Sequence, residues 1–436
     1  MAGPIWGDRY RDDLRPGLRR RRGGDRGAAA VGGETGAVLR AVAGRQPPPR
    51  HASLRRLRNA AGETLDHALV LWLPGPASYT GEDSAELHLH GGRAVVAAVA
   101  DALAAAGARP AEPGEFTRRA FLNGKLDLVA AEAVADLVAA ETEAQRRQAL
   151  RQLEGALGDL YRSWSARLLA LMAGEEALID FPDEDLPPAL AAAAAAERAA
   201  LAADIAAHLA DSHRGERLRE GLVFAVTGPP NVGKSSLVNA LAGRDVAIVS
   251  ALPGTTRDAL ETRLILGGVP VTLVDTAGLR ETADPIEAEG VRRARAHAAA
   301  ADLVLALSEA GSPAPAREHG SVPVLAIATK TDLGGAVPPG ALGVSAAAGA
   351  GLAALRARLA AAAERLTQAA GPAPLTRTRH RAALIDALAA LERVAPLPEL
   401  RAEDLRQAVR ALGRITGAVA VEDVLDRIFS AFCIGK

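Results

Sequence analysis

Residues 222–243 are LVFAVTGPPNVGKSSLVNALAG. A strand-like apolar run comes first, and Gly228 is followed after four residues by Gly233, Lys234 and Ser235, where helical spacing begins. Glycines let backbone N–H groups turn inward around phosphates, and a helix N-terminus adds favourable partial charge. The lysine reaches the β and γ phosphates, and the serine ligates Mg²⁺. The stretch predicts a nucleotide-binding loop between a strand and a helix.

Two further motifs follow in the expected order. VTLVDTAGL puts Asp275 at the end of a predicted strand, with Thr276, Ala277 and Gly278 after it, and resembles the Mg²⁺ and γ-phosphate loop of GTPases. Before it, PGTTRD supplies Thr256, whose hydroxyl can complete the Mg²⁺ shell when GTP orders this loop. We therefore expect Ser235 and Thr256 to be the Mg²⁺ ligands.

The segment ATKTD, which follows the apolar run 322–328, resembles the guanine-binding NKxD motif with Thr329 in place of Asn. The Asp332 carboxylate can accept both N1–H and the exocyclic amine of guanine, a pair that adenine does not offer, so GTP is predicted over ATP. The Thr329 hydroxyl can still hold the loop, although loss of the amide is expected to weaken nucleotide binding. The predicted GTP-binding set is Asn231, Val232, Gly233, Lys234, Ser235, Ser236, Ser250, Ala251, Leu252, Pro253, Gly254, Thr255, Thr256, Asp275, Thr276, Ala277, Gly278, Thr329, Lys330, Asp332, Ser345 and Ala346.

The residue after DTAG is Leu279, where Ras-like enzymes carry the glutamine that positions the attacking water. Leucine cannot form a hydrogen bond with water, so hydrolysis needs another group. Glu287, in the segment ADPIEAEG, is the candidate catalytic carboxylate. A solvated first-turn helix residue is the alternative, and the sequence leaves the two interpretations even.

The composition bounds the remaining possibilities. The chain has 436 residues, of which 49% are hydrophobic and 24% charged, and we expect three domains. The formal net charge of −1 shows no overall cationic character, so any nucleic acid must be bound by a local cationic patch or through a partner protein. Cys433 is the only cysteine, and no apolar run could cross a bilayer. We expect a cytoplasmic protein with no membrane association.

Lysine is nearly eliminated, because only Lys125, Lys234, Lys330 and Lys436 occur in the whole chain. A GC-rich genome that replaces lysine by arginine would retain lysine where a compact ammonium is needed. Two of the four lie in nucleotide motifs, so Lys125 and Lys436 become candidates for chemistry. Survival by chance is the alternative.

Patterning along the chain predicts a multidomain fold with α/β and α parts. Residues 1 to about 50 show no clean periodicity, which is typical of disorder or a linker. Strand-like runs and helices from Ala68 onward suggest an α+β region, helical spacing dominates 129–219 and 379–436, and alternating strands and helices fill 221–366. We infer that a P-loop (Ras-like) G domain is inserted into a helical domain. The predicted domains are 1–122 (N-terminal α+β), 123–219 (helical, first part), 220–370 (G domain) and 371–436 (helical, second part).

Seven stretches carry a resemblance to a known family: PGPASYTGEDSAELHLHGG, PGEFTRRAFLNGKLDLVAAEA, IDFPDED, GPPNVGKSSLVNAL, PGTTRD, DTAGLRET and the terminal FSAFCIGK. Together they resemble the MnmE (TrmE) family of tRNA modification GTPases. The resemblance implies a folate-binding N-terminal domain that also dimerises. It further implies that, with an FAD-dependent MnmG-type partner, the chain uses 5-formyltetrahydrofolate to build 5-carboxymethylaminomethyluridine at the tRNA wobble position. A homodimer, and a heterotetramer with the partner, are expected.

The same resemblance assigns site residues by position. Glu86, Lys125 and Lys436 correspond to folate contacts, although Glu86 could instead be an exposed strand residue. Cys433 corresponds to the family's essential cysteine, and the sequence does not distinguish a role as nucleophile, acid or base. The alternative is that Cys433 is a buried residue of a hydrophobic core with no chemical role. The K⁺ site, which stands in for an arginine finger, corresponds to Asn231, Ser250, Leu252 and Thr255.

Two histidines of the sequence are candidate metal ligands. His88 and His90 alternate along a predicted strand and would share a face, but no third ligand is evident. We expect a structural role and no zinc.

Two different functional classes remain as alternatives. An RNA-binding ribosome-assembly GTPase would need a separate RNA-binding module, and none is evident after Arg379. A purely regulatory GTPase would leave Lys125, Cys433 and Lys436 without a function.

Residues 1–32 depart from the family pattern. They are rich in arginine and glycine and lack the strand-like alternation, the Pro-Pro-Gly turn and the arginine followed by Ser-Gly that the family carries, whereas ETGAVLRAVAGRQPPPR after them resembles its first helix and loop. If they are translated in a wrong frame, the chain lacks a folate-contacting arginine and a strand of the N-terminal domain. Translation in a wrong frame and a genuine divergent tail are both open. A wrong frame predicts GTP hydrolysis with poor binding of formyl-folate and poor self-association.

Overall fold

The computed structural model describes residues 4–7, 25–180, 188–211, 213–243, 261–275, 301–313, 322–368, 373–393, 395–419, 425, 428, 429 and 432. The chain divides into two compact units, one of residues 1–135, 152–194 and 393–436 and the other of residues 136–151 and 195–392. The predicted G domain lies whole within the second unit, while the predicted helical domain contributes to both. The domain boundaries given above stay a prediction.

The first unit contains a six-stranded sheet. Its strand order is β3-β4-β5-β2-β1-β6, antiparallel except for the parallel pair β1 and β6. The strands are β1 (Pro4–Gly7), β2 (Asp25–Val31), β3 (Ser53–Arg58), β4 (Thr64–Leu73), β5 (Ser84–His90) and β6 (Arg109–Pro110).

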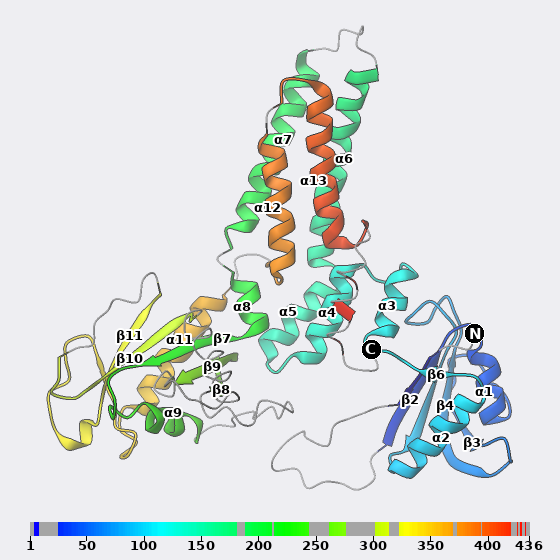
Figure 1. Cartoon of the computed structure of the whole chain (residues 1–436), viewed down its shortest axis with the longest axis horizontal. Coiled ribbons are helices and arrows are strands. Elements are labelled where there is room, and N and C mark those ends of the chain that lie inside the picture. Colours follow the sequence, from blue (N-terminus) through cyan, green and yellow to red (C-terminus); the bar gives the residue numbers. More distant parts are fainter. Residues whose placement is uncertain are drawn as a thin grey trace, which may run out of the picture. The chain divides into compact units, whose positions relative to one another are not determined.

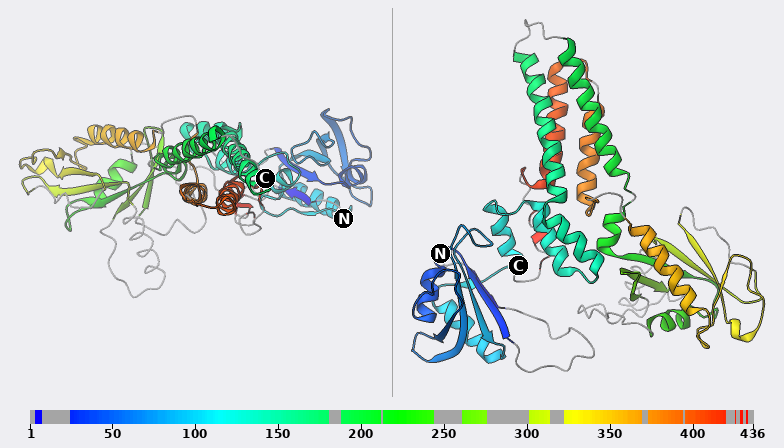
Figure 2. Two further views of the ribbon diagram at one scale, coloured as in Figure 1. Left: turned by 90° about the horizontal axis from the view of Figure 1, so that it is seen from above. Right: turned by 180° about the vertical axis from the view of Figure 1, so that it is seen from behind.

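Helices α1 (Thr35–Ala43) and α2 (Arg93–Ala105) pack together against this sheet (Figures 1 and 2). Strand β5 shows why the sheet has an inner and an outer face, because its residues from Ala85 to His90 alternate between buried and exposed. Leu87 is fully buried in the core with Leu39 of α1, whereas Glu86 and His88 are exposed.

The sequence of residues 1–32 shows no strand-like alternation, yet the described part of this range forms strands. Both β1 and β2 fall in this range, and β2 pairs with β5 along its whole length. The alternation is hidden because β2 is built from small residues: Ala28 and Ala30 are buried at 6% and 4% exposure, and the side chain between them is also only alanine. The predicted helix after this stretch is confirmed as α1.

The remaining helices of the first unit follow the sheet. They are α3 (Glu115–Leu122), most of α4 (Leu128–Ala139), α6 (Ala156–Asp180) and α13 (Pro398–Thr416), while α5 (Glu143–Leu153) ends at the unit boundary. α6 and α13 lie side by side, and Arg401 is joined to Glu175 at 2.8 Å. Among the described residues, no helix combines the length and the apolar composition needed to cross a bilayer.

The second unit holds most of α7 (Pro188–Leu209), α8 (Arg214–Glu220) and α12 (Thr378–Glu392). α7 contacts α12 through Arg198, whose Nε donates to the carbonyl oxygen of Leu391 at 2.8 Å. α8 leads through Gly221 directly into the first strand of a second sheet.

This second sheet has the order β12-β11-β10-β7-β9-β8, with all pairs parallel except β8 and β9. Its strands are β7 (Leu222–Thr227), β8 (Glu261–Leu266), β9 (Val269–Asp275), β10 (Leu303–Glu309), β11 (Val324–Thr329) and β12 (Leu342–Gly343). Helices α9 (Lys234–Ala242) and α11 (Leu352–Thr367) both contact β8 and β9. Within the described residues, the strands and helices predicted for 221–366 are present, but β8 and β9 follow one another with no helix between them.

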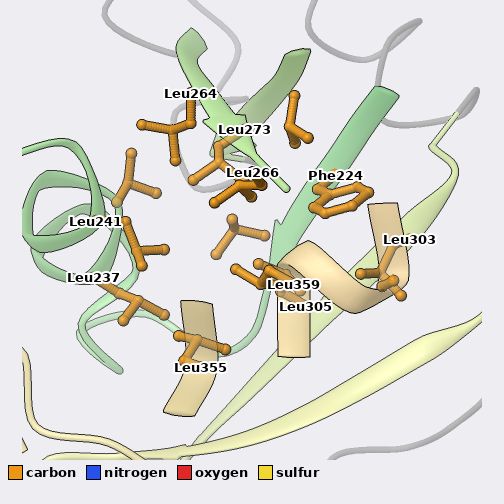
Figure 3. Close-up of a cluster of buried hydrophobic side chains, with 14 of the residues drawn as sticks. Phe224, Leu237, Leu241, Leu264, Leu266, Leu273, Leu303, Leu305, Leu355 and Leu359 are labelled. Carbon is orange, nitrogen blue, oxygen red and sulfur yellow. The ribbon is translucent and has the colours of Figure 1, made fainter. Parts of the chain in front are cut away.

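The core of this sheet is almost entirely leucine and valine (Figure 3). Phe224 from the central strand, Leu237 from α9 and Leu355 from α11 converge in it, each at most 1% exposed. Full burial of one such side chain contributes about 1.5–3 kcal/mol. This packing holds the start of α9 at the end of β7, where the phosphate loop lies.

Candidate nucleotide site

The phosphate loop leaves the carboxyl end of β7, between the neighbouring strands β9 and β10. Chain segments on either side of β7 run to opposite edges of the sheet, and such a switch point is where parallel sheets bind ligands. Gly228 has φ 144°, and a Cβ there would lie 2.6 Å from the carbonyl oxygen of Leu307, so only glycine fits. Asn231 and Gly233 also have positive φ, which turns successive backbone N–H groups to one side.

Three predicted phosphate and Mg²⁺ residues are brought together here. Lys234 is 6% exposed, and its Nζ donates to the carbonyl oxygens of Gly228 and Pro229, both at 2.8 Å. Ser235 Oγ donates to Asp275 Oδ2 at 2.7 Å, although the two residues are 40 positions apart. A hydroxyl and a carboxylate side by side are hard oxygen donors, so this pair fits Mg²⁺.

Thr329 ends β11 and is buried beneath the loop. Its Oγ1 donates to the carbonyl oxygen of Val232 at 2.6 Å and lies 3.1 Å from that of Ser308. A hydroxyl therefore does tie the guanine-binding motif to the phosphate loop.

The remaining base-contacting residues lie in the loops after β11 and β12. Asp332 is exposed in the short 3₁₀ helix η2 (Thr331–Leu333), which follows Lys330 in a left-handed conformation. Ser345 is fully buried, and its Oγ accepts from the backbone N–H of Ala348 at 3.0 Å. The next helix, α11, begins after Gly351.

Several predicted site residues lie outside the described residues. They are Ser250, Ala251, Leu252, Pro253, Gly254, Thr255, Thr256, Thr276, Ala277, Gly278, Glu287, Cys433 and Lys436. Their assignments stay predictions.

A second constellation lies in the first unit, where the FLNGK motif meets the PGPASYTGED loop. Lys125 Nζ donates to the carbonyl oxygen of Pro76 at 2.8 Å. Asn123 Nδ2 donates to Thr80 O at 2.8 Å and contacts Glu82 Oε1 at 3.2 Å. Two motifs more than 40 residues apart therefore form one surface.

Ion pairs that sequence reasoning missed support this surface. Arg119 contacts Glu82 at 2.9 Å and Glu115 at 3.0 Å, and Arg109 contacts Glu115 at 2.6 Å. The i,i+4 spacing of Glu115 and Arg119 could have indicated one of these pairs. Burial raises the pKa of Glu115, but hydrogen bonds from Arg109, the Glu112 backbone N–H and Arg119 outweigh it and lower the pKa below 4.5.

These groups line a cleft of 810 Å³ whose rim includes Phe429, from the terminal FSAFCIGK motif. Gly114, at the start of α3, approaches this segment closely, since a Cβ there would lie 2.7 Å from the carbonyl oxygen of Phe429.

Glu86 lies on the open face of the sheet with its side chain 49% exposed, 3.5 Å from His88. His90 Nδ1 lies 2.7 Å from Asp66.

The phosphate loop at the switch point, the adjoining serine and carboxylate, and the TKxD segment tied to the loop define a P-loop GTPase. Two family models match the chain: "GTP-binding protein TrmE N-terminus" over residues 26–125 and "MnmE helical domain" over residues 128–433. Together they span most of the sequence.

Curated relatives agree. The chain is 58% identical over 426 residues to a tRNA modification GTPase MnmE of Gluconacetobacter diazotrophicus, which covers 95% of this chain and 97% of the relative. It is 55% identical to that of Rhodospirillum rubrum over 97% of this chain and 98% of the relative, and 54% identical to that of Granulibacter bethesdensis over 95% and 98%. The chain belongs to the MnmE (TrmE) family of tRNA modification GTPases.

Proposed function

We propose that this chain hydrolyses GTP to drive the modification of the wobble uridine of tRNA to 5-carboxymethylaminomethyluridine. The observation that carries the proposal is the assembled phosphate site, in which Lys234, Ser235 and Asp275 meet, on a chain more than half identical to tRNA modification GTPases over nearly its full length.

The phosphate loop binds the nucleotide through its backbone N–H groups and Lys234. Ser235, which lies beside Asp275, and Thr256 would hold Mg²⁺. The ion would neutralise charge that develops on the phosphates. Asp332 selects guanine, and Thr329 keeps its motif in register with the loop.

Hydrolysis needs a substitute for the glutamine that Leu279 replaces. We assign the cation site to Asn231 with Ser250, Leu252 and Thr255, and the water-orienting role to Glu287. Support comes from Asn231, which is exposed in the phosphate loop with φ 59°. Hydrolysis should then be faster in K⁺ than in Na⁺ by a large factor, since a finger-type charge is worth about 10³ to 10⁵ in rate. Equal rates in both salts would refute the cation site.

The one-carbon chemistry belongs to the first unit. We assign the binding of 5-formyltetrahydrofolate to Glu86, Lys125 and Lys436, with Cys433 in the modification step and an FAD-dependent MnmG-type protein as partner. A homodimer, and a heterotetramer with the partner, complete the proposal. Its support is the surface that joins Lys125 and Asn123 to the PGPASYTGED loop, beside the cleft at Phe429.

The test is mass spectrometry of the wobble uridine in tRNA from a strain that lacks the gene, complemented with single variants. Wild type should restore the modification, while Lys234→Ala should not, because it removes the phosphate-binding cation. Cys433→Ser should also fail, yet the purified variant should hydrolyse GTP normally. Full modification with Lys234→Ala would overturn the proposal for GTP hydrolysis, and full modification with Cys433→Ser would overturn the role of the cysteine.

A further inference from the structure

One stretch of the first unit is strongly cationic. Between Glu34 and Glu63 the chain has no acidic residue, although its formal net charge is only −1. The same stretch carries six arginines, which we call the arginine edge: Arg40, Arg45, Arg50, Arg55, Arg56 and Arg58.

Part of the arginine edge lies on a border strand of the sheet that the described residues form. Strand β3 is the first strand in the sheet order, and it carries three of the six side chains. Successive side chains of a strand point to opposite faces, so Arg55 shares a face with buried Leu57, on the α1 side of the sheet. Arg56 and Arg58 lie on the opposite, open face. Cations therefore flank both faces of one strand.

None of the six forms an ion pair within the part of the chain that the structure describes. Arg40 donates to Gln46 at 2.9 Å, Arg50 to the carbonyl oxygen of Ala77, and Arg55 Nη1 to that of Leu54 at 3.1 Å. Arginines elsewhere behave differently, since Arg119, Arg162 and Arg401 each contact a carboxylate, at 2.9, 2.6 and 2.8 Å. The arginine edge has cationic charge that the described chain does not neutralise.

A cleft of 590 Å³ adjoins β3 on the α1 side. Its lining includes Arg45, Arg55, Trp72 and the three prolines 47–49, and no carboxylate. The Nε of Arg55 is buried and has no hydrogen-bond partner among the described residues. Buried polar groups normally have a hydrogen-bond partner, so a cleft lined by two cations and one unpartnered donor is suited to an oxygen ligand.

We propose that the arginine edge binds the sugar-phosphate backbone of the tRNA substrate, with one phosphate in the cleft between Arg45 and Arg55. The inference rests on the proposed tRNA modification. The six residues of β3 extend about 20 Å, which spans several phosphates of a nucleic-acid strand. Arginine suits this ligand because its planar fork matches phosphate oxygens.

Protection of the sheet edge and binding of an acidic protein account for these charges less well. Charged residues on an edge strand also prevent pairing between sheets, but that role does not require a cleft with an unpartnered Nε. An acidic protein would be expected to cover a larger apolar area beside the charges than the one cross-strand pair of exposed leucines, Leu54 and Leu69, provides.

The test measures binding of unmodified tRNA to the full-length protein at several salt concentrations. The variant Arg45→Gln with Arg55→Gln should bind more weakly, and the slope of log K against log salt should fall in magnitude by about two. Arg56→Gln with Arg58→Gln, which spares the cleft, should show the same direction. The matched control is Arg406→Gln with Arg410→Gln, which removes equal charge from two arginines beside Glu403 and should change neither quantity.

GTP hydrolysis and thermal unfolding of each variant should match wild type, because the arginine edge lies outside the nucleotide site. If wild type modifies and binds tRNA while both edge variants bind it with unchanged affinity and slope, the arginine edge proposal is overturned and the proposed function stands. Loss of binding to a protein partner, with tRNA binding intact, would also overturn it. A wild-type protein that neither binds nor modifies tRNA would overturn both.

Discussion

Thr329 occupies a position where a hydroxyl replaces the usual amide, and two bonds define its role. It joins the phosphate loop at Val232 to the end of β10 at Ser308. Thr329→Val keeps the shape of the side chain but removes the hydroxyl donor. The buried carbonyl oxygens of Val232 and Ser308 then lose their hydrogen bond from residue 329. We expect a loss of about 1–3 kcal/mol, shared between stability and GTP affinity.

Calorimetric titration with GTP and denaturant unfolding of the same variant would measure both parts. Thr329→Ser is the control, because it retains the hydroxyl and should bind GTP much more tightly than the valine variant. Wild-type affinity and stability in Thr329→Val would show that the hydroxyl contributes nothing.

At the scale of elements, α8 is the helix that introduces the G domain, and it packs against the segment that leaves it. Arg214 donates to the carbonyl oxygen of Gln368 at 2.9 Å, and Arg219 to that of Thr376 at 2.7 Å. A Cβ on Gly215 would lie 2.2 Å from the carbonyl oxygen of Leu375. The two segments of the connection therefore meet with no room for a side chain.

Gly215→Ala should accordingly destabilise the second unit by about 1–3 kcal/mol through overpacking. Gly174→Ala in α6 is the matched control, since nothing lies within 4 Å of its added Cβ and alanine favours a helix by about 1 kcal/mol. Urea unfolding of both variants would check the opposite signs. Equal stability of the two would contradict the close approach seen at α8.

Helix α3 offers a test of pH dependence through Glu115. Its pKa lies below 4.5 in the folded protein, so its contribution to stability is fully present above pH 4.5 and is lost as the pH falls through the lowered pKa. Glu115→Gln should destabilise the first unit at pH 7 by about 1–3 kcal/mol, because Arg109 and Arg119 lose a charged acceptor. The difference from wild type should shrink as the pH falls below about 4.5.

Unfolding curves at several pH values would measure this convergence. Glu143→Gln is the comparison. Hydrogen bonds from Arg146 and Arg147 lower the pKa of Glu143 to about 2. These three side chains are exposed, so water screens their interaction. Its effect should be smaller than that of Glu115→Gln. A difference between Glu115→Gln and wild type that stays constant from pH 7 to pH 3 would contradict the linkage.

At the scale of the whole molecule, the two compact units have separate apolar cores. Only the second contains the nucleotide site. Two thermal transitions are therefore expected, and GTP with Mg²⁺ should raise only one of them. At a GTP concentration 100 times Kd the stabilisation is about 2.7 kcal/mol.

Differential scanning calorimetry with and without nucleotide would show the shift. Lys234→Ala should keep both transitions and remove the shift, because it deletes the phosphate-binding cation inside a folded core. A single transition, or an equal shift of both, would show that the units unfold together.

Much of the nucleotide site could be predicted because its motifs are short and continuous. Gly228, Gly233 and Lys234 act through their own backbone turn and the helix that follows, so spacing alone predicts the loop. Small side chains had the opposite effect in β2, where Ala28 and Ala30 are too weakly apolar to reveal a strand that is stabilised by pairing with β5.

The sequence by itself determined the strand, loop and helix of the phosphate site, the choice of GTP, and the family to which the chain belongs, because each depends on neighbouring residues. Tertiary structure decided the contacts between distant residues: Ser235 with Asp275, Thr329 with Val232, and Lys125 with Pro76. It also placed three arginines of the arginine edge on β3, the first strand in the order of the described sheet, beside a cleft. Such contacts depend on strand order and on which face each residue occupies, and these follow from burial of the whole core rather than from local spacing.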